Sequence, residues 1–250
     1  MLDDLDRLME KSQIDALMAI GNAFETPDIY WLTGFRSGDV ITYVKNVGEE
    51  AVVASFFNTL ERVQKESNIK QTYDLSDTMI GMLKEGRNPR KHLDVFDKEV
   101  TQEVVNGKII GVPNHYPAHR LVILQKLGYE VKVVSDLLQE ARAKKSAAEV
   151  KAIVRAGKAT TGAISSVLEM VKDSDIGTNK VLIHKGKPLT VGTMKLALEH
   201  HLLDNNAESA EDSILAVGKK AFDWHYLGRP TDKMKADTPV ILDVFPRLKH

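Results

Sequence analysis

The sequence has no cysteine, no long apolar run and almost no net charge. Without cysteine the chain cannot form a disulfide scaffold, a cysteine-ligated zinc or iron–sulfur site, or a thiol nucleophile. Lys and Arg number 34 against 35 Asp and Glu, a formal net charge of −1, so the composition lacks the basic excess typical of nucleic-acid-binding proteins. No apolar run approaches the roughly 18 to 20 residues that cross a bilayer. We therefore expect neither a nucleic-acid partner nor a membrane partner.

The N-terminus also lacks the positively charged and apolar regions of a secretory signal. Asp3 and Asp4 are acidic, and Leu2, Leu5 and Leu8 recur at helical spacing, which predicts a helix of the mature chain. Together with the absence of cysteine, this favours a cytoplasmic location. The 250 residues, of which 43% are apolar, fit an ordinary globular protein with one large or two modest domains.

The first half of the chain alternates helical patterns with short β-rich runs, which predicts an α/β layer over residues 1–136. Residues 40–44 and 51–57 are rich in β-branched and aromatic side chains and flank a polar turn that contains Gly48, so they predict a hairpin. The other predicted strands cover residues 14–20, 108–112 and 131–134, and the predicted helices cover residues 58–66, 76–84, 91–105 and 117–127.

The pattern changes after Ser135, because apolar positions then keep a helical period as far as Val171 with few breakers. We expect one long or kinked helix over residues 137–171. The basic segment at its start places the domain boundary near residue 138, so the expected domains are 1–137 and 138–250. Beyond it we expect a helix over residues 190–203 and β structure in the last fifty residues, with strands at 214–217 and 240–245.

Most of the histidines indicate structure rather than chemistry. His115 and His119 lie four residues apart, a spacing that can serve zinc, but Pro117 stands between them and would start the helix after His115. His200 and His201 are adjacent near a helix end, and neighbouring positions on a helix do not face the same way. The usual phosphate-loop, dinucleotide and serine-hydrolase motifs are absent from the sequence.

The C-terminal region carries the stronger candidates. Asp243 closes the apolar run that begins at Val240, so its carboxylate needs a partner or a cation if that strand is buried. His225 stands between Trp224 and Tyr226, which suggests the wall of a pocket. Each feature alone is more often structural than functional, but their order along the chain adds information.

That order resembles the creatinase/prolidase, or pita-bread, superfamily, which includes Xaa-Pro dipeptidases and Xaa-Pro aminopeptidases. The resemblance covers essentially the whole chain. It rests on five segments in the family's order, namely residues 27–35 (Pro-Asp-Ile-Tyr-Trp-Leu-Thr-Gly-Phe), Gly111-Val112 with residues 128–131, Arg142 with Lys145, Ser146 and Glu149, then His225-Tyr226, and finally Asp243. It implies an α/β fold, in which a creatinase-like N-terminal domain with a mixed sheet precedes the first half of a pita-bread α+β catalytic domain.

The resemblance also implies a chemistry. Members of the family hold two divalent ions, often manganese, cobalt or zinc, which share carboxylates and a bridging hydroxide that attacks the scissile carbonyl. On this view Asp243 is the first metal ligand, His225 is a catalytic residue that also binds substrate, and Tyr226 contacts the substrate, a proline-containing peptide. The N-terminal domain would serve a homodimer.

Three departures weaken this expectation. Residues 244–247 lack the small residue that commonly follows the first ligand, and Gly192-Thr193-Met194-Lys195 lacks the family's acid. The sequence also stops before the positions of the other four ligands, so we expect a C-terminally truncated chain that binds no metal stably and is inactive alone. Two alternatives therefore stay open: a catalytically silent homologue that acts as a binding or dimerisation module, and a metal-free, creatinase-like amidinohydrolase with His225 as its acid/base.

Overall fold

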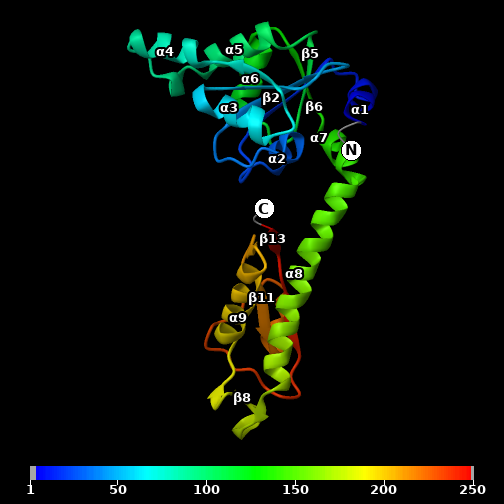
Figure 1. The fold of residues 1–250 in the computed structure, drawn as a ribbon, viewed down its shortest axis with the longest axis vertical. Coiled ribbons are helices and arrows are strands. Elements are labelled where there is room, and N and C mark those ends of the chain that lie inside the picture. The colour runs from blue at the N-terminus through cyan, green and yellow to red at the C-terminus, as the bar shows by residue number, and fades with distance from the viewer. Residues whose placement is uncertain (1–3, 249–250) are drawn as a thin grey trace. The chain divides into compact units, whose positions relative to one another are not determined.

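A computed structural model describes residues 4–248, and the chain divides into two compact units, Met1–Lys145 (unit 1) and Ser146–His250 (unit 2) (Figure 1). Unit 1 contains two groups of buried apolar side chains and unit 2 contains a third. The predicted domain boundary lay earlier in the chain, after residue 137. The assignment of the units as family domains stays a prediction.

Unit 1 is built on a six-stranded sheet with the strand order β4-β3-β2-β1-β5-β6. The strands are β1 (Ala16–Gly21), β2 (Ile41–Asn46), β3 (Val52–Ser55), β4 (Gln71–Asp74), β5 (Ile109–Val112) and β6 (Glu130–Val133). β1 pairs antiparallel with β2, and β2 pairs antiparallel with β3, whereas the pairs β3–β4, β1–β5 and β5–β6 are parallel. The expectation of a mixed sheet in an α/β fold is confirmed.

The predicted hairpin is the β2–β3 pair. Every residue of β2 is buried, which fits its place inside the sheet, and Val44 pairs with Val52 at the turn end. Gly48 has a φ of 76° in this turn, a conformation that glycine adopts without the clash that a Cβ would cause. The turn chemistry and the strand composition therefore agree on the hairpin.

Helices cover both faces of this sheet. Because side chains alternate along a strand, Leu17 and Ala19 of β1 enter one core, and Ala16, Met18 and Ile20 enter the other. The first core includes side chains of α1 (Leu5–Lys11), α2 (Pro27–Thr33), α3 (Phe57–Glu66) and α7 (Ser135–Ala143). The second core includes side chains of α4 (Ser76–Lys84), α5 (Leu93–Glu103) and α6 (Ala118–Lys126), and the 3-10 turn η2 (Pro89–Lys91) precedes α5. The predicted N-terminal helix is α1, although Leu2 and Asp3 lie outside the described residues.

One long or kinked helix was predicted over residues 137–171, and this is wrong, because the chain forms two separate helices, α7 and α8 (Ala147–Lys172). Lys144 is extended, and Ser146 begins α8 with a capping box: its hydroxyl accepts from the Glu149 amide at 3.2 Å, and the Glu149 carboxylate accepts from the Ser146 amide at 2.7 Å. This reciprocal pair satisfies two amides that a helix start leaves free. Arg142, at the end of α7, pairs with Asp28 at 2.7 Å within unit 1.

Over its described residues, 146–248, unit 2 combines two helices with three small sheets. Its helices are α8 and α9 (Val191–Asp204), and the 3-10 turns are η3 (Thr178–Lys180) and η4 (Gly218–Phe222). The strands are β7 (Asp175–Ile176), β8 (Leu182–His184), β9 (Lys187–Pro188), β10 (Ala207–Ser209), β11 (Ile214–Val217), β12 (Val240–Asp243) and β13 (Pro246–Leu248). They pair as β7-β8-β9, β10-β13 and β11-β12. The predicted helix at 190–203 and the predicted strand at 214–217 are confirmed, and the strand predicted over 240–245 ends earlier, at Asp243.

The two helices of unit 2 pack on each other through small residues of α8. Ala159, Ala163 and Val167 are buried in the same core as Leu198 and Leu202 of α9. A Cβ on Gly162 would lie 2.4 Å from Nε2 of His201, so glycine leaves the space that this imidazole occupies. His201 therefore takes part in helix packing.

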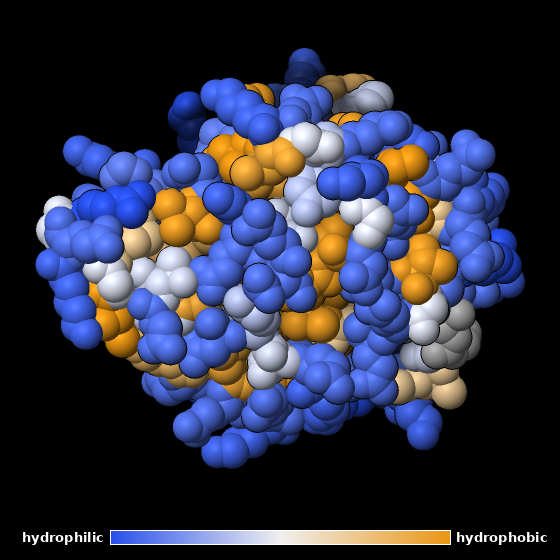
Figure 2. Space-filling model, turned by 90° about the horizontal axis from the view of Figure 1, so that it is seen from above, coloured by the Kyte–Doolittle hydropathy of each residue, from blue (hydrophilic) through white to orange (hydrophobic). Residues whose placement is uncertain are grey.

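Among residues 4–248, no helix combines the length and the apolar character needed to cross a bilayer. On the face that Figure 2 shows, apolar side chains lie in small groups separated by hydrophilic ones. Scattered apolar groups of this kind are normal on folded proteins. This face therefore offers no broad apolar surface.

Candidate functional site

The sequence-predicted site residues all lie in unit 2, around the β11–β12 pair. The two strands run antiparallel, with Ile214 opposite Asp243 at one end and Val217 opposite Val240 at the other. Leu215 and Ala216 of β11 are fully buried, whereas Asp243 is exposed. The carboxylate of Asp243 is thus solvated and needs no protein partner, and it is open to a cation.

His225 lies on the segment that returns from the other end of this pair. The chain leaves β11 at Val217, turns through η4 and comes back along β11, where the Leu215 amide donates to the Leu227 carbonyl at 3.3 Å. Gly228 follows with a φ of 87°, and a Cβ there would lie 2.1 Å from the Leu215 carbonyl oxygen. Only glycine allows so close a return.

The backbone around His225 is held by Asp223. The carboxylate of Asp223 accepts from the His225 amide at 3.1 Å, and its carbonyl accepts from the Tyr226 amide at 3.1 Å. The His225 side chain itself is exposed. Trp224 is 79% exposed, so the predicted aromatic pocket wall is wrong for this residue: its ring lies in solvent.

Tyr226 belongs to a polar cluster that sequence reasoning missed. Its hydroxyl donates to Asp232 at 2.7 Å, Lys220 donates to the same carboxylate at 2.6 Å, and the Arg229 amide donates at 3.2 Å. The Lys220 ammonium also lies 5.4 Å from the centre of the Tyr226 ring, within cation–π range. The hydrogen bond from Lys220, followed by those from Tyr226 and the Arg229 amide, lowers the pKa of Asp232 to about 2.

The structure therefore brings some of these residues together and not others. Tyr226, Lys220 and Asp232 form one hydrogen-bonded cluster, and His225 precedes Tyr226 on the same return segment. Asp243 lies at the end of the strand pair that is remote from η4. No sequence pattern pointed to Lys220 or Asp232, because residues 12 apart in an irregular loop have no fixed spatial relation.

The residues present do not form a metal centre by themselves. Among residues 4–248, no group of three or more His, Cys, Asp or Glu side chains could hold a metal ion. Divalent ions of the expected kind need several oxygen or nitrogen ligands, and Asp243 supplies one carboxylate. The donor set of the described residues thus does not fit a dinuclear site.

The histidine pair with the zinc-like spacing belongs to unit 1. His119 lies in α6 and His115 precedes that helix, where its Nδ1 is 3.7 Å from Asp28. Pro117 stands at the N-cap of α6, so only one of the two imidazoles is helical. The prediction that Pro117 starts the helix after His115 is confirmed.

The fold is that of the pita-bread, creatinase-like proteins, and three solved structures illustrate it. The match to the prolidase from Pyrococcus horikoshii OT3 has 21% sequence identity and a TM-score of 0.71. It covers 100% of this chain and 61% of the prolidase chain. The match to the Xaa-Pro dipeptidase from Bacillus anthracis has 15% identity and a TM-score of 0.73, and it covers 99% of this chain and 61% of that one. The match to the X-Pro aminopeptidase from Thermotoga maritima MSB8 has 14% identity and a TM-score of 0.65, and it covers 98% of this chain and 60% of that one.

These similarities show the fold over essentially the whole chain, so the predicted fold class is confirmed. The chain spans about 60% of the length of the solved structures that it matches. No protein-family model and no curated protein sequence matches it. Sequence identity between 14% and 21% reflects shared architecture, and function has to be argued from the site.

Proposed function

We propose that this chain supplies the creatinase-like domain and part of the catalytic domain of an Xaa-Pro metallopeptidase. The observation that carries the proposal is the coverage of the chain, from 98% to 100%, by the folds of a prolidase, an Xaa-Pro dipeptidase and an X-Pro aminopeptidase. The order of the family-like segments supports it independently, because sequence motifs and backbone architecture are separate observations. The proposed substrate is a proline-containing peptide.

Within this proposal the chain's own residues have distinct roles. Asp243, exposed at the end of β12, would ligate manganese, cobalt or zinc together with further ligands that the described residues do not provide. His225, exposed on the return segment, would bind the substrate carbonyl or carboxylate and move a proton. Tyr226 would contact substrate through its ring, since its hydroxyl already donates to Asp232. Dimerisation through unit 1 and a cytoplasmic location belong to the same proposal.

The test is hydrolysis of Ala-Pro and Leu-Pro by the protein that carries this chain, after metal removal and after addition of Mn²⁺, Co²⁺ or Zn²⁺ singly. We expect activity only with added metal, and none from residues 1–250 alone. Asp243→Asn should abolish both metal binding, measured by elemental analysis, and hydrolysis. His225→Ala should lower turnover while metal stays bound.

Matched variants control for loss of charge and for loss of an imidazole. Asp237→Asn removes another exposed carboxylate, which pairs with Lys180 at 2.8 Å, and His200→Ala removes an exposed histidine of α9. Both should leave metal content and hydrolysis unchanged. Lack of hydrolysis with all three metals would refute the peptidase and favour a silent binding module. Activity that survives exhaustive chelation would refute the metalloenzyme and favour the metal-free amidinohydrolase.

A further inference from the structure

Unit 1 contains a cavity that is lined only by its own residues, between Ile20 and Arg120. Its volume is about 500 Å³, within the range of roughly 300 to 1,000 Å³ that is typical of small-molecule sites. It lies over the sheet face that carries the second core, where Ile20, Thr42 and Ala54 of three neighbouring strands face it. Side chains of α4, η2 and α5 complete its walls.

The walls are mainly apolar, but a buried ion pair also borders the cavity. Asp97 of α5 is 1% exposed and bonds to Nη1 of Arg120 in α6. The second carboxylate oxygen of Asp97 and the hydroxyl of Tyr116 are buried, and neither has a hydrogen-bond partner among residues 4–248. Burial is the main cause that raises the pKa of Asp97, and burial, with the nearby Asp97 charge, raises the pKa of Tyr116. Burying an ion pair of this kind costs desolvation free energy, and its presence marks the cavity as a candidate site.

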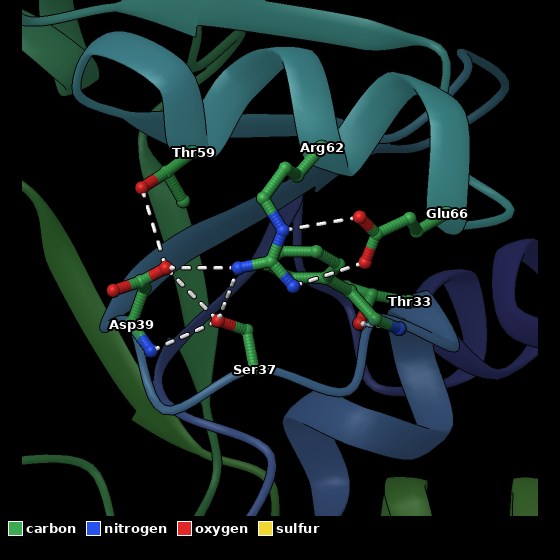
Figure 3. A network of polar contacts seen from close by, with 7 residues as sticks. Thr33, Ser37, Asp39, Thr59, Arg62 and Glu66 are labelled. Atoms are coloured by element: carbon green, nitrogen blue, oxygen red, sulfur yellow. Dashed lines mark hydrogen bonds and ion pairs between the residues drawn. The ribbon is translucent and has the colours of Figure 1, made fainter. Parts of the chain in front are cut away.

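The second acidic side chain at the cavity, Asp39, already has polar partners. Figure 3 shows its carboxylate facing Arg62, Ser37 and Thr59. The Asp39 carboxylate oxygen lies 3.6 Å from Arg62, and it accepts from Ser37 at 2.9 Å and from Thr59 at 3.4 Å. Arg62 is held in place by Glu66 at 3.0 Å. Asp39 therefore shares the charge of Arg62 with Glu66, and its carboxylate faces Arg62, Ser37 and Thr59.

Arg90 is the charged side chain of the cavity that has no ion-pair partner among residues 4–248. It lies in η2, where Pro89 restricts the backbone and the Asn88 side chain accepts from the Arg90 amide at 3.0 Å. The Arg90 side chain is exposed, and within the described part of the chain no carboxylate forms an ion pair with it. The cavity thus combines apolar walls with one guanidinium that forms no ion pair within the described part of the chain. Arg120 provides further N–H donors at the cavity, because the Asp97 contact uses one of its five.

We propose that this cavity binds a small apolar carboxylate. The apolar body lies among side chains such as Phe56, Met79 and Phe96. The carboxylate pairs with Arg90, and the free donors of Arg120 provide a second hydrogen-bonding group. A free branched-chain amino acid and a simple carboxylic acid share this chemistry. The inference does not depend on the peptidase proposal.

The first test compares three probes on the 250-residue chain by titration calorimetry: 4-methylpentanoate, L-leucine and the neutral 4-methylpentanamide. We expect saturable binding of at least one of the two carboxylates, and binding of the amide at least tenfold weaker. Tighter binding of leucine would assign a free amino acid, and tighter binding of 4-methylpentanoate a simple carboxylic acid. Equal affinity for acid and amide, or no saturable binding of either carboxylate, overturns the proposal.

Variants then locate the site. Arg90→Ala should weaken carboxylate binding at least tenfold, whereas Arg87→Ala, which removes a nearby arginine that lines neither cavity of this region, should not change it. Val40 is 55% exposed and lines the cavity, so Val40→Trp should block entry without loss of folding. An adjoining cavity of about 540 Å³ shares Arg90 but not Val40, and Lys91 lines only that one. If Lys91→Ala weakens binding and Val40→Trp does not, the ligand occupies the adjoining cavity and the proposal is wrong.

Discussion

The buried pair between Asp97 and Arg120 allows a quantitative test of the cavity region. Arg120→Met keeps the length and apolar stem of the side chain but leaves the Asp97 carboxylate buried without its cation. Breaking a buried ion pair from one side costs about 3 to 5 kcal/mol. Because the Arg120 side chain is 13% exposed and the Asp97 side chain 1%, water reaches the site from one side, and we expect a loss of about 3 kcal/mol near the low end of that range.

The assay must report on unit 1 alone, and the two tryptophans make this possible. Trp31 packs against the first core of unit 1, and Trp224 is largely exposed in unit 2. In a Trp224→Phe background, fluorescence therefore follows the unfolding of unit 1. With a urea dependence of about 2 kcal/mol per molar, the Arg120→Met midpoint should fall by about 1.5 M. Lys126→Met, an exposed change in the same helix, should cost less than about 0.5 kcal/mol.

The stability deficit of Arg120→Met should depend on pH. Burial raises the pKa of Asp97 above its value in the unfolded chain, and loss of Arg120 raises it further. The folded variant then takes up a proton at a higher pH than the unfolded chain, so its deficit is largest near pH 8 and shrinks as the pH falls. The double change Asp97→Leu with Arg120→Met should return to within about 1 kcal/mol of the parent. A deficit equal at pH 5 and pH 8, or a double variant as unstable as Arg120→Met, would refute the reasoning.

Two further predictions concern the start of α8 and the loop around Tyr226. Ser146→Ala should cost about 1 kcal/mol of local stability, measured by hydrogen exchange of the Glu149 amide, whereas Ser165→Ala on the exposed face of α8 should not; equal exchange would contradict the capping role. Asp232 should titrate near pH 2 by carboxyl NMR, so its stabilising contribution is complete above about pH 4 and is lost as the pH falls toward 2. Lys220→Met should move that midpoint toward 3.8, and a parent midpoint already near 3.8 would refute the cluster.

Much of unit 1 was predictable because its elements obey local rules. The hairpin over residues 40–57 combines strand-forming side chains with a glycine that the turn requires, and both signals lie within a few residues. The break before α8 was missed, because the apolar period continues from Leu137 through Val154 as if one helix were present. The Ser146-x-x-Glu149 capping signature stood in the sequence and would have located it.

The candidate site was less predictable, and part of it remains a prediction. His225, Tyr226 and Asp243 came from a family resemblance, and no observation of the structure tests their roles. The link from Tyr226 to Lys220 and Asp232 depends on how an irregular segment returns along β11, and such a path has no sequence period. The cavity of unit 1 depends on side chains from strands, helices and a 3-10 turn spread between Ile20 and Arg120, so only packing in three dimensions reveals it.

The central position of β1 also bears on the order in which unit 1 folds. Its antiparallel partner, β2, is close in sequence, because Gly21 pairs with Ile41, 20 residues further on. Its parallel partner, β5, is distant, because Ala16 pairs with Ile110, 94 residues further on. Closing the longer loop costs about 1.4 kcal/mol more chain entropy by the logarithmic dependence on loop length. Assembly is thus expected to proceed from the β1–β2–β3 meander, with β5 and β6 added later, and this late non-local pairing limits the folding rate.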